Sequence, residues 1–282
     1  MGAADVSDEI PHEIPTSARV YGWALGSKDN YEVDRRFALQ SLPHFPEFVD
    51  LVRENRRFLY RAVRYLAAEA GIRQFLDMGC GLPTDDNVHQ VAQKFAPDAR
   101  VVYVDIDPIV LAHARALLAG DGSTVVITAD MRDQAGVLEH EEVKRLIDFD
   151  EPVAVLFLSI GHHLLDSDDP AGVLHHVIDR AAPGSHLAFT QVVCDDPERR
   201  AEVDATANGA GMPWRGRSRA EVDALFRSDL VPVEPGLTDI VDWRPDPGQP
   251  PLAPVPEELS AFAGASKMGR DLTEYGGILR RP

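Results

Sequence analysis

Residues 75–84 read FLDMGCGLPT, an apolar run that ends in an acidic residue and two closely spaced glycines. This order predicts a buried strand that turns sharply into a helix, because glycine lets the backbone pass close to a ligand. A dinucleotide-binding turn would carry a third glycine where this chain has Thr84, and Pro83 lacks an N–H for a pyrophosphate. The turn suits a ligand without phosphate, whose carboxylate meets free amides and whose ammonium faces Asp77. An ordinary strand–helix turn would use the same glycines.

Strand and helix patterns alternate along the chain around this turn. Apolar runs predict strands at residues 74–78, 100–104, 124–129, 153–159 and 185–192. Helical patterns lie between them at residues 88–95, 109–118, 137–147 and 172–181. Such alternation predicts βαβ units, a parallel sheet and right-handed crossovers. Further on we expect a helix at 219–226, a proline-rich loop at 244–256 and strands at 237–243 and 277–280.

The N-terminal part has a different pattern. Residues 1–16 are polar, acidic and proline-containing, which indicates a loose tail. A helical pattern follows, with breaks at residues 25–30 and 42–46. Residues 48–68 carry apolar side chains at three- and four-residue steps, which predicts an amphipathic helix. We therefore expect a tail and helical cap over residues 1–70, followed by one α/β domain over residues 71–282.

The composition of the chain restricts the kinds of molecule that it is expected to bind. The 282 residues include 28 Lys and Arg against 46 Asp and Glu, and the net charge of -18 opposes nucleic-acid binding. No run approaches the roughly 20 apolar residues that span a membrane, and the acidic start lacks the layout of a secretory signal. The two cysteines, Cys80 and Cys194, lie outside any metal-type spacing, and no metal is expected. We expect a cytoplasmic protein without membrane contact.

An acidic residue also closes the second expected strand. Asp105 follows residues 100–104 directly, and a carboxylate at this place accepts hydrogen bonds from both hydroxyls of a ribose. Its neighbour Ile106 is assigned to the same site. Asp107 is interpreted as the N-cap of the next helix, with Pro108 at the first helical position. Simple solubility of the loop is the other explanation for Asp105.

The third and fourth strands end in further candidate side chains. Asp130 can bond an exocyclic amine of adenine and Met131 can pack on its ring, although a helix N-cap and a core methionine explain the same pair. The fourth strand ends at Ser159, and His162 and His163 follow it. Because ligands bind at the carboxyl ends of such strands, either histidine can serve as a general base, while at least one can be structural.

The order of these signals resembles that of class I methyltransferases, which depend on S-adenosyl-L-methionine. The segments PTSARVY (15–21), LGSKDN (25–30), ENRRFL (54–59) and YGG (275–277) make the resemblance closer. They are similar to the actinomycete-type S-adenosyl methyltransferase family, whose substrate is unassigned. The likeness extends over residues 15–282, nearly the whole chain.

The resemblance implies a fold, a cofactor and a site. The fold would be a Rossmann-like α/β sheet, mostly parallel, with a late antiparallel strand at residues 277–280 inserted between its neighbours. The cofactor would be S-adenosyl-L-methionine. Its binding residues would be Asp77, Gly79, Gly81, Asp105, Ile106, Asp130, Met131 and Ser159. The loop formed by Lys28, Asp29 and Asn30 would close over the cofactor or acceptor, although an N-cap at Asp29 or Asn30 is the structural alternative.

The expected reaction is in-line methyl transfer, in which the protein mainly aligns the partners and excludes water. A base is needed only if the acceptor must lose a proton; His162 or His163 would supply it and Tyr21 would line the acceptor pocket. The loop after the fourth strand lacks the Asn- or Asp-Pro-Pro-aromatic pattern of methyltransferases acting on base or amide nitrogens. Together with the acidic charge, this favours a small-molecule acceptor over DNA or RNA. Two alternatives stay open, an NAD-dependent oxidoreductase and a non-catalytic protein that binds S-adenosylmethionine.

Overall fold

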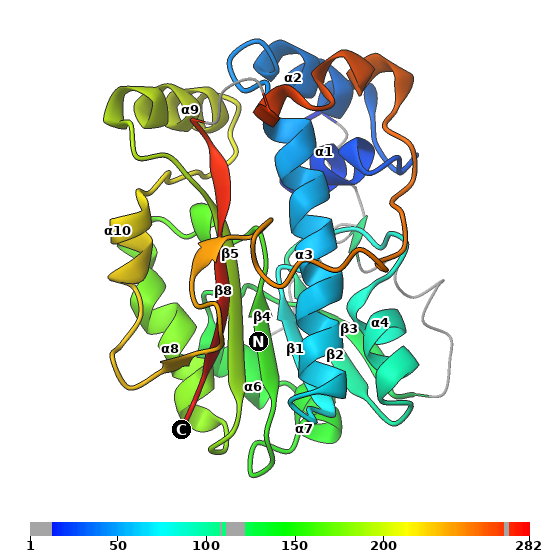
Figure 1. Ribbon diagram of the computed structural model, residues 1–282, viewed down its shortest axis with the longest axis vertical. Coiled ribbons are helices and arrows are strands. Elements are labelled where there is room, and N and C mark those ends of the chain that lie inside the picture. The colour runs from blue at the N-terminus through cyan, green and yellow to red at the C-terminus, as the bar shows by residue number, and fades with distance from the viewer. Residues whose placement is uncertain (1–12, 108, 111–121, 268–270) are drawn as a thin grey trace, which may run out of the picture.

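The computed structural model describes residues 13–107, 109–110, 122–267 and 271–282. Its centre is one twisted sheet in the order β3-β2-β1-β4-β5-β8-β6, and β7 pairs with β8 beyond this path (Figure 1). The strands are β1 Gln74–Met78, β2 Arg100–Asp105, β3 Thr124–Thr128, β4 Ala154–Phe157, β5 His186–Val193, β6 Val231–Pro232, β7 Thr238–Asp239 and β8 Thr273–Arg280. Strands β1 to β5 pair in parallel, whereas β8 runs antiparallel to β5, β6 and β7. The late antiparallel strand between its neighbours is thereby confirmed.

The helices follow the expected alternation. They are α1 Ser17–Ala24, α2 Glu32–Ser41, α3 Phe48–Ala68, α4 Val88–Phe95, α6 Gln134–Glu139, α7 Glu141–Leu146, α8 Pro170–Arg180, α9 Pro197–Gly209 and α10 Arg219–Asp223, with short 3-10 turns at Gly161–His163, Asp166–Asp168, Glu257–Phe262 and Ala265–Lys267. The bounds of α3 and α4 are the predicted ones. The helix expected at 109–118 lies outside the described residues except for its first two positions.

The helix expected at 219–226 ends at Asp223, and two other predicted elements differ more from the structure. The single helix expected at 137–147 is split into α6 and α7, because His140 is extended and its side chain accepts a hydrogen bond from the Glu142 N–H to start α7. The strand expected at 237–243 is reduced to β7. There the Asp239 backbone carbonyl accepts a hydrogen bond from the Asp242 N–H, and the chain turns instead of extending.

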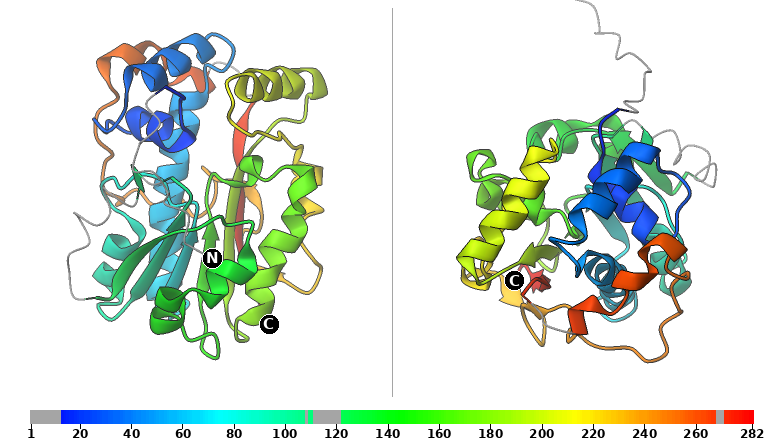
Figure 2. Two further views of the ribbon diagram at one scale, coloured as in Figure 1. Left: turned by 180° about the vertical axis from the view of Figure 1, so that it is seen from behind. Right: turned by 90° about the horizontal axis from the view of Figure 1, so that it is seen from above.

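Two apolar layers enclose the sheet. One layer packs α3 and α4 against one face, with Phe58, Leu66 and Trp243 fully buried. The other packs α6, α7, α8 and α10 against the opposite face, around Phe157 and Phe189. The view from behind shows α8 crossing this second face (Figure 2). The carboxyl ends of the parallel strands all open toward the same end of the molecule.

A cap covers that end of the sheet. Helices α1 and α2, the start of α3 and the segment around Leu259 share one apolar cluster, so the cap draws on both ends of the chain (Figures 1 and 2). A buried ion pair joins its first two helices, with Arg19 Nε 2.7 Å from Asp34 Oδ2. The boundary at residue 70 stays a prediction, because α3 belongs to the cap cluster and to the sheet layer alike. Within the described residues, no helix has the length and apolar character to cross a membrane.

Candidate active site

The glycine turn after β1 closes onto the end of β2. The Gly79 N–H donates to the Val104 carbonyl at 2.7 Å, and both Gly79 and Gly81 have positive φ angles, of 75° and 64°. A Cβ on Gly79 would lie 2.7 Å from the side chain of Ile160. The turn therefore requires glycine at this position for two independent reasons.

Asp105 lies at the end of β2 and faces this turn. Its two carboxylate oxygens accept hydrogen bonds from Gly81 N at 2.7 Å and from Asp107 N at 2.9 Å. Burial raises the pKa of the Asp105 carboxyl, and the backbone N–H groups offset part of that rise. Each oxygen keeps a second lone pair for a ligand. The neighbouring Ile106 is 61% exposed beside this carboxylate.

Asp77 is the most perturbed acidic group of the turn. Burial raises the pKa of its carboxyl to about 7, Arg56 opposes the rise and Asp105 adds to it. Arg56 comes from α3 and donates to the Asp85 carbonyl at 2.6 Å, while its Nε is buried without a partner in the described chain. This arginine was not assigned from the sequence, although the ENRRFL segment that contains it supported the family resemblance.

The residues after β3 differ from the expected adenine site, because Asp130 is already paired with a neighbouring arginine. Asp130 is held in an ion pair by Arg132, with Nη2 and Oδ2 2.6 Å apart, and this pair lowers the pKa of the Asp130 carboxyl. Met131 is half-buried against the core layer of α6 and α8. An adenine amine at this place would therefore share the Asp130 carboxylate with Arg132.

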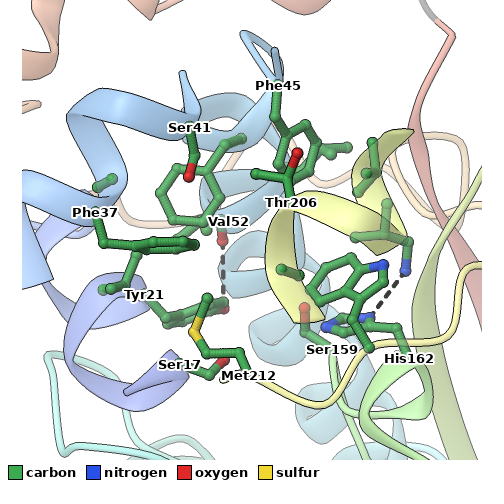
Figure 3. Close-up of a pocket in the computed structure, with 18 of the residues that line it drawn as sticks. Ser17, Tyr21, Phe37, Ser41, Phe45, Val52, Ser159, His162, Thr206 and Met212 are labelled. Atoms are coloured by element: carbon green, nitrogen blue, oxygen red, sulfur yellow. Dashed lines mark hydrogen bonds between the residues drawn. The ribbon is translucent and has the colours of Figure 1, made fainter. Parts of the chain in front are cut away.

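A cavity of about 80 Å³ opens between the cap and the carboxyl end of the sheet (Figure 3). Its walls come from α1, α2, α3, the loop after β4, strands β5 and β8, and α9 with the loop that follows it. Most of the lining is apolar or aromatic and includes Val20, Phe37, Phe45, Phe48, Met212 and Trp214. Tyr21, Ser159, His162 and His163 from the predicted set line the same cavity. The sequence did not identify α9, although Asp196 caps it and Pro197 occupies its first turn.

A chain of hydrogen bonds runs behind this cavity. Tyr21 donates its hydroxyl to the Val52 carbonyl at 3.3 Å (Figure 3) and accepts from Asn55 Nδ2 at 2.8 Å. The Asn55 carbonyl accepts from the Thr190 hydroxyl at 2.9 Å, and Thr190 in turn accepts from Ser159 N at 2.7 Å. Burial raises the pKa of the Tyr21 phenol to about 12. Tyr21 is therefore a fixed, neutral wall of the cavity.

His163 bridges the cap and the loop after α9. Its Nδ1 lies 2.7 Å from the Pro213 carbonyl, and its Nε2 lies 2.9 Å from the Ser17 hydroxyl. Because a carbonyl only accepts, Nδ1 carries the proton, and the neutral ring accepts the Ser17 hydroxyl hydrogen at Nε2. Burial lowers the pKa of His163. Both ring nitrogens are thus engaged by protein groups.

His162 is buried beneath Trp214, with ring centroids 3.9 Å apart. Its Nδ1 accepts from the Val192 N–H at 3.3 Å, so in the neutral ring Nε2 carries the proton. Burial lowers the pKa of His162 well below its usual value, and His163 and Arg217 add to the shift. In this tautomer His162 offers the cavity a donor and no acceptor.

The hydrogen bonds of the loop at residues 27–30 run mainly within the loop and to Arg35 of α2. Lys28 and Asp29 are exposed, the Asp29 N–H donates to the Ser27 hydroxyl at 3.1 Å, and Asn30 Oδ1 accepts from Arg35 at 2.6 Å. Leu25, Gly26 and Ser27 line a second, more open cavity of about 410 Å³ beside Gly81. The role of Lys28, Asp29 and Asn30 as a closing loop stays a prediction.

Comparisons with known proteins identify the family. A model described as S-adenosyl methyltransferase matches residues 3–270. The chain belongs to this family. It is similar to the solved structures of a candidate methyltransferase from Thermobifida fusca YX (40% identity, TM-score 0.84, 99% of each chain) and of a duf574 family protein from Streptomyces avermitilis (35% identity, TM-score 0.84, 97% of this chain and 100% of the other). A candidate S-adenosyl-L-methionine-dependent methyltransferase of Mycobacterium bovis is 30% identical over 226 residues, 79% of this chain and 70% of the relative.

The protein is therefore a methyltransferase that depends on S-adenosyl-L-methionine, as predicted, and a methyl acceptor is implied. Its residues fit this cofactor, because the site offers the buried carboxylate of Asp77 for an ammonium and the half-buried carboxylate of Asp105 for a ribose. It also offers a guanidinium nitrogen of Arg56 that has no partner in the described residues. When bound, the cofactor supplies an activated methyl group. The sheet with its antiparallel β8 also contradicts the all-parallel arrangement expected for the nicotinamide alternative.

Proposed function

We propose that the cofactor lies along the carboxyl ends of β1, β2 and β4 and that its methyl group points into the apolar cavity. The support is the convergence of the turn, the acidic strand ends and the loop after β4 on one edge of the sheet. The proposed binding residues are Asp77, Gly79, Gly81, Asp105, Ile106, Asp130, Met131 and Ser159. Arg56 is added to them as a partner for the cofactor carboxylate.

We further propose that the methyl acceptor is a small, largely apolar molecule. The observation that carries this proposal is the cavity itself, whose aromatic walls enclose a space that a folded protein or a duplex could not enter. The net charge of -18 adds an unfavourable field for nucleic-acid phosphates. The cap would hold the acceptor in line with the methyl group and exclude water from it. Residence in the cytoplasm stays a prediction from composition.

A cavity-filling substitution tests this function. Ala207 on α9 lines the cavity, and Ala205 lies on the exposed side of the same helix. We expect Ala207→Trp to block methyl transfer to small hydroxyl, amine and thiol compounds while affinity for S-adenosylhomocysteine is unchanged, and Ala205→Trp to behave as the unaltered protein. Transfer is measured with isotopically labelled methyl and affinity by calorimetry. Methyl transfer to RNA, DNA or protein that Ala207→Trp leaves intact would contradict the proposal.

A further inference from the structure

A buried carboxylic acid, Glu274, lines the acceptor cavity and has no part in the proposed binding of the cofactor. Glu274 lies on β8, where alternate side chains face α3, and its side chain is wholly buried. It contributes to the wall of the cavity beside Ser159. Neither carboxyl oxygen accepts a well-directed hydrogen bond within the described residues, although the Ser159 and Thr190 hydroxyls lie close to it. The nearby Thr190 hydroxyl gives its hydrogen to Asn55 instead.

The groups around Glu274 favour its neutral form while the site is without cofactor. Burial raises the pKa of the Glu274 carboxyl to about 8, the Thr190 and Ser159 hydroxyls oppose the rise, and Glu54 of α3 and Asp239 of β7 add to it. The phenol of Tyr21 also faces it from α1, and burial keeps that phenol neutral. The two charged groups with the largest effect on Glu274, Glu54 and Asp239, are both negative.

A purely structural role does not explain this residue. A buried polar group whose hydrogen bonds are poorly made costs up to about 1–3 kcal/mol, and more if it is charged. An apolar side chain at this core position of β8 would avoid that cost. Its two oxygens point to a ligand that supplies the missing hydrogen. The two histidines of the cavity are poorer proton acceptors, because His163 already accepts from Ser17 and His162 from Val192.

We propose that Glu274 is the general base of the reaction and that the methyl acceptor is an apolar molecule bearing a hydroxyl group. This rests on the proposed function. The hydroxyl oxygen forms its bond to the methyl carbon as the carbon–sulfur bond breaks, and the bonding pair leaves with sulfur. The O–H pair stays on oxygen and the proton passes to a Glu274 carboxylate. One positive and one negative charge disappear together, which favours the step in a buried, low-dielectric site.

The charge of the cofactor sets the protonation state that this step needs. A positive sulfonium near the cavity favours the carboxylate form of Glu274, which then holds the hydroxyl by a charge-assisted hydrogen bond. After transfer that positive charge is absent, and the surrounding acids again favour the protonated form. The aromatic walls, with Phe37, Phe45 and Trp214, fit a flat ring as the body of the acceptor.

The test compares two probe acceptors of one shape. In 2-naphthol the hydroxyl keeps its proton at neutral pH, whereas in 2-naphthalenethiol the more acidic thiol is largely ionised and needs no base. We expect Glu274→Gln to slow methyl transfer to the naphthol by about 100-fold or more and to leave transfer to the thiol unchanged. Affinity for S-adenosylhomocysteine should also be unchanged, which shows that the variant is folded.

The pH profile gives a second readout. For the unaltered protein, kcat/KM for the naphthol should rise with pH as Glu274 loses its proton, and Glu54→Gln should move this rise to lower pH because it removes a negative neighbour. Equal loss of both probes, or an unchanged naphthol rate in Glu274→Gln, overturns the assignment of the base. If the unaltered protein binds S-adenosylhomocysteine and methylates the thiol but not the naphthol, the hydroxyl class is wrong while the proposed function stands.

Discussion

Asp105 should be the largest single contributor to cofactor affinity from the strand ends. Its carboxylate accepts hydrogen bonds from Gly81 N at 2.7 Å and Asp107 N at 2.9 Å, which leaves one lone pair on each oxygen for the two ribose hydroxyls. Hydrogen bonds to a charged group contribute about 1.5–3 kcal/mol each. Loss of two such bonds in Asp105→Ala should therefore cost roughly 3–6 kcal/mol, an affinity lower by about 100-fold or more.

The measurement is calorimetric titration with S-adenosylhomocysteine, alongside a melting curve of each protein. The melting curve is needed because Asp105→Ala also removes the acceptor for two backbone N–H groups of the turn. Asp107→Asn is the matched control, since that side chain caps the following helix through Ile109 N at 2.9 Å and is not assigned to the ribose. Unchanged affinity in a folded Asp105→Ala protein, or a larger loss in Asp107→Asn, would refute the assignment.

Two further predictions concern buried charge. Asp34→Ala removes the carboxylate that pairs with the buried Arg19, and the free energy of unfolding in urea should fall by about 3–5 kcal/mol. A double variant that also carries Arg19→Met should recover part of this free energy. A loss below about 1 kcal/mol in Asp34→Ala would argue against the importance of the ion pair. The Asp77 carboxyl, with a pKa of about 7 in the folded protein against 3.8 in a free chain, keeps a proton that the unfolded chain releases, so its contribution to stability is lost as pH rises from about 4 to about 7. Melting temperatures against pH should lose part of this slope in Asp77→Asn, and an identical slope in both proteins would count against the shift.

The regular elements could be predicted because their patterns are local. The three- and four-residue spacing of apolar side chains along α3 and the helical pattern between the first two strands for α4 predicted the bounds of both helices. The split between α6 and α7 could not be predicted in the same way, since it depends on one residue, His140, that ends one helix and begins the next. Helix α9 was missed because only Val203 and Ala207 of its 13 residues are buried, which leaves almost no apolar periodicity.

The residues proposed to bind the cofactor could be predicted from the sequence because of the topology of the sheet. The carboxyl ends of parallel strands meet at one edge of the sheet. The acidic residues at the ends of β1 and β2 and just after β3 therefore lie along that edge whatever the intervening helices do. No comparable topological rule predicts which residues line the acceptor cavity. Tyr21 and Met212 line the same space from segments nearly two hundred residues apart in the chain, and only packing of the cap against α9 brings them together (Figure 3).

The titratable residues of the acceptor cavity show why residue type alone does not identify the general base. Histidine was favoured in the sequence because its ordinary pKa is near neutral, yet burial lowers the pKa of His162 and His163, and protein groups already occupy their acceptor nitrogens. Burial acts in the opposite sense on a carboxyl and brings Glu274 toward neutral pH. The last strand, predicted at residues 277–280, begins at Thr273 in the structure and so includes Glu274. A polar side chain at a buried position of a strand, without a well-directed hydrogen bond, is where a role in ligand binding or catalysis is expected.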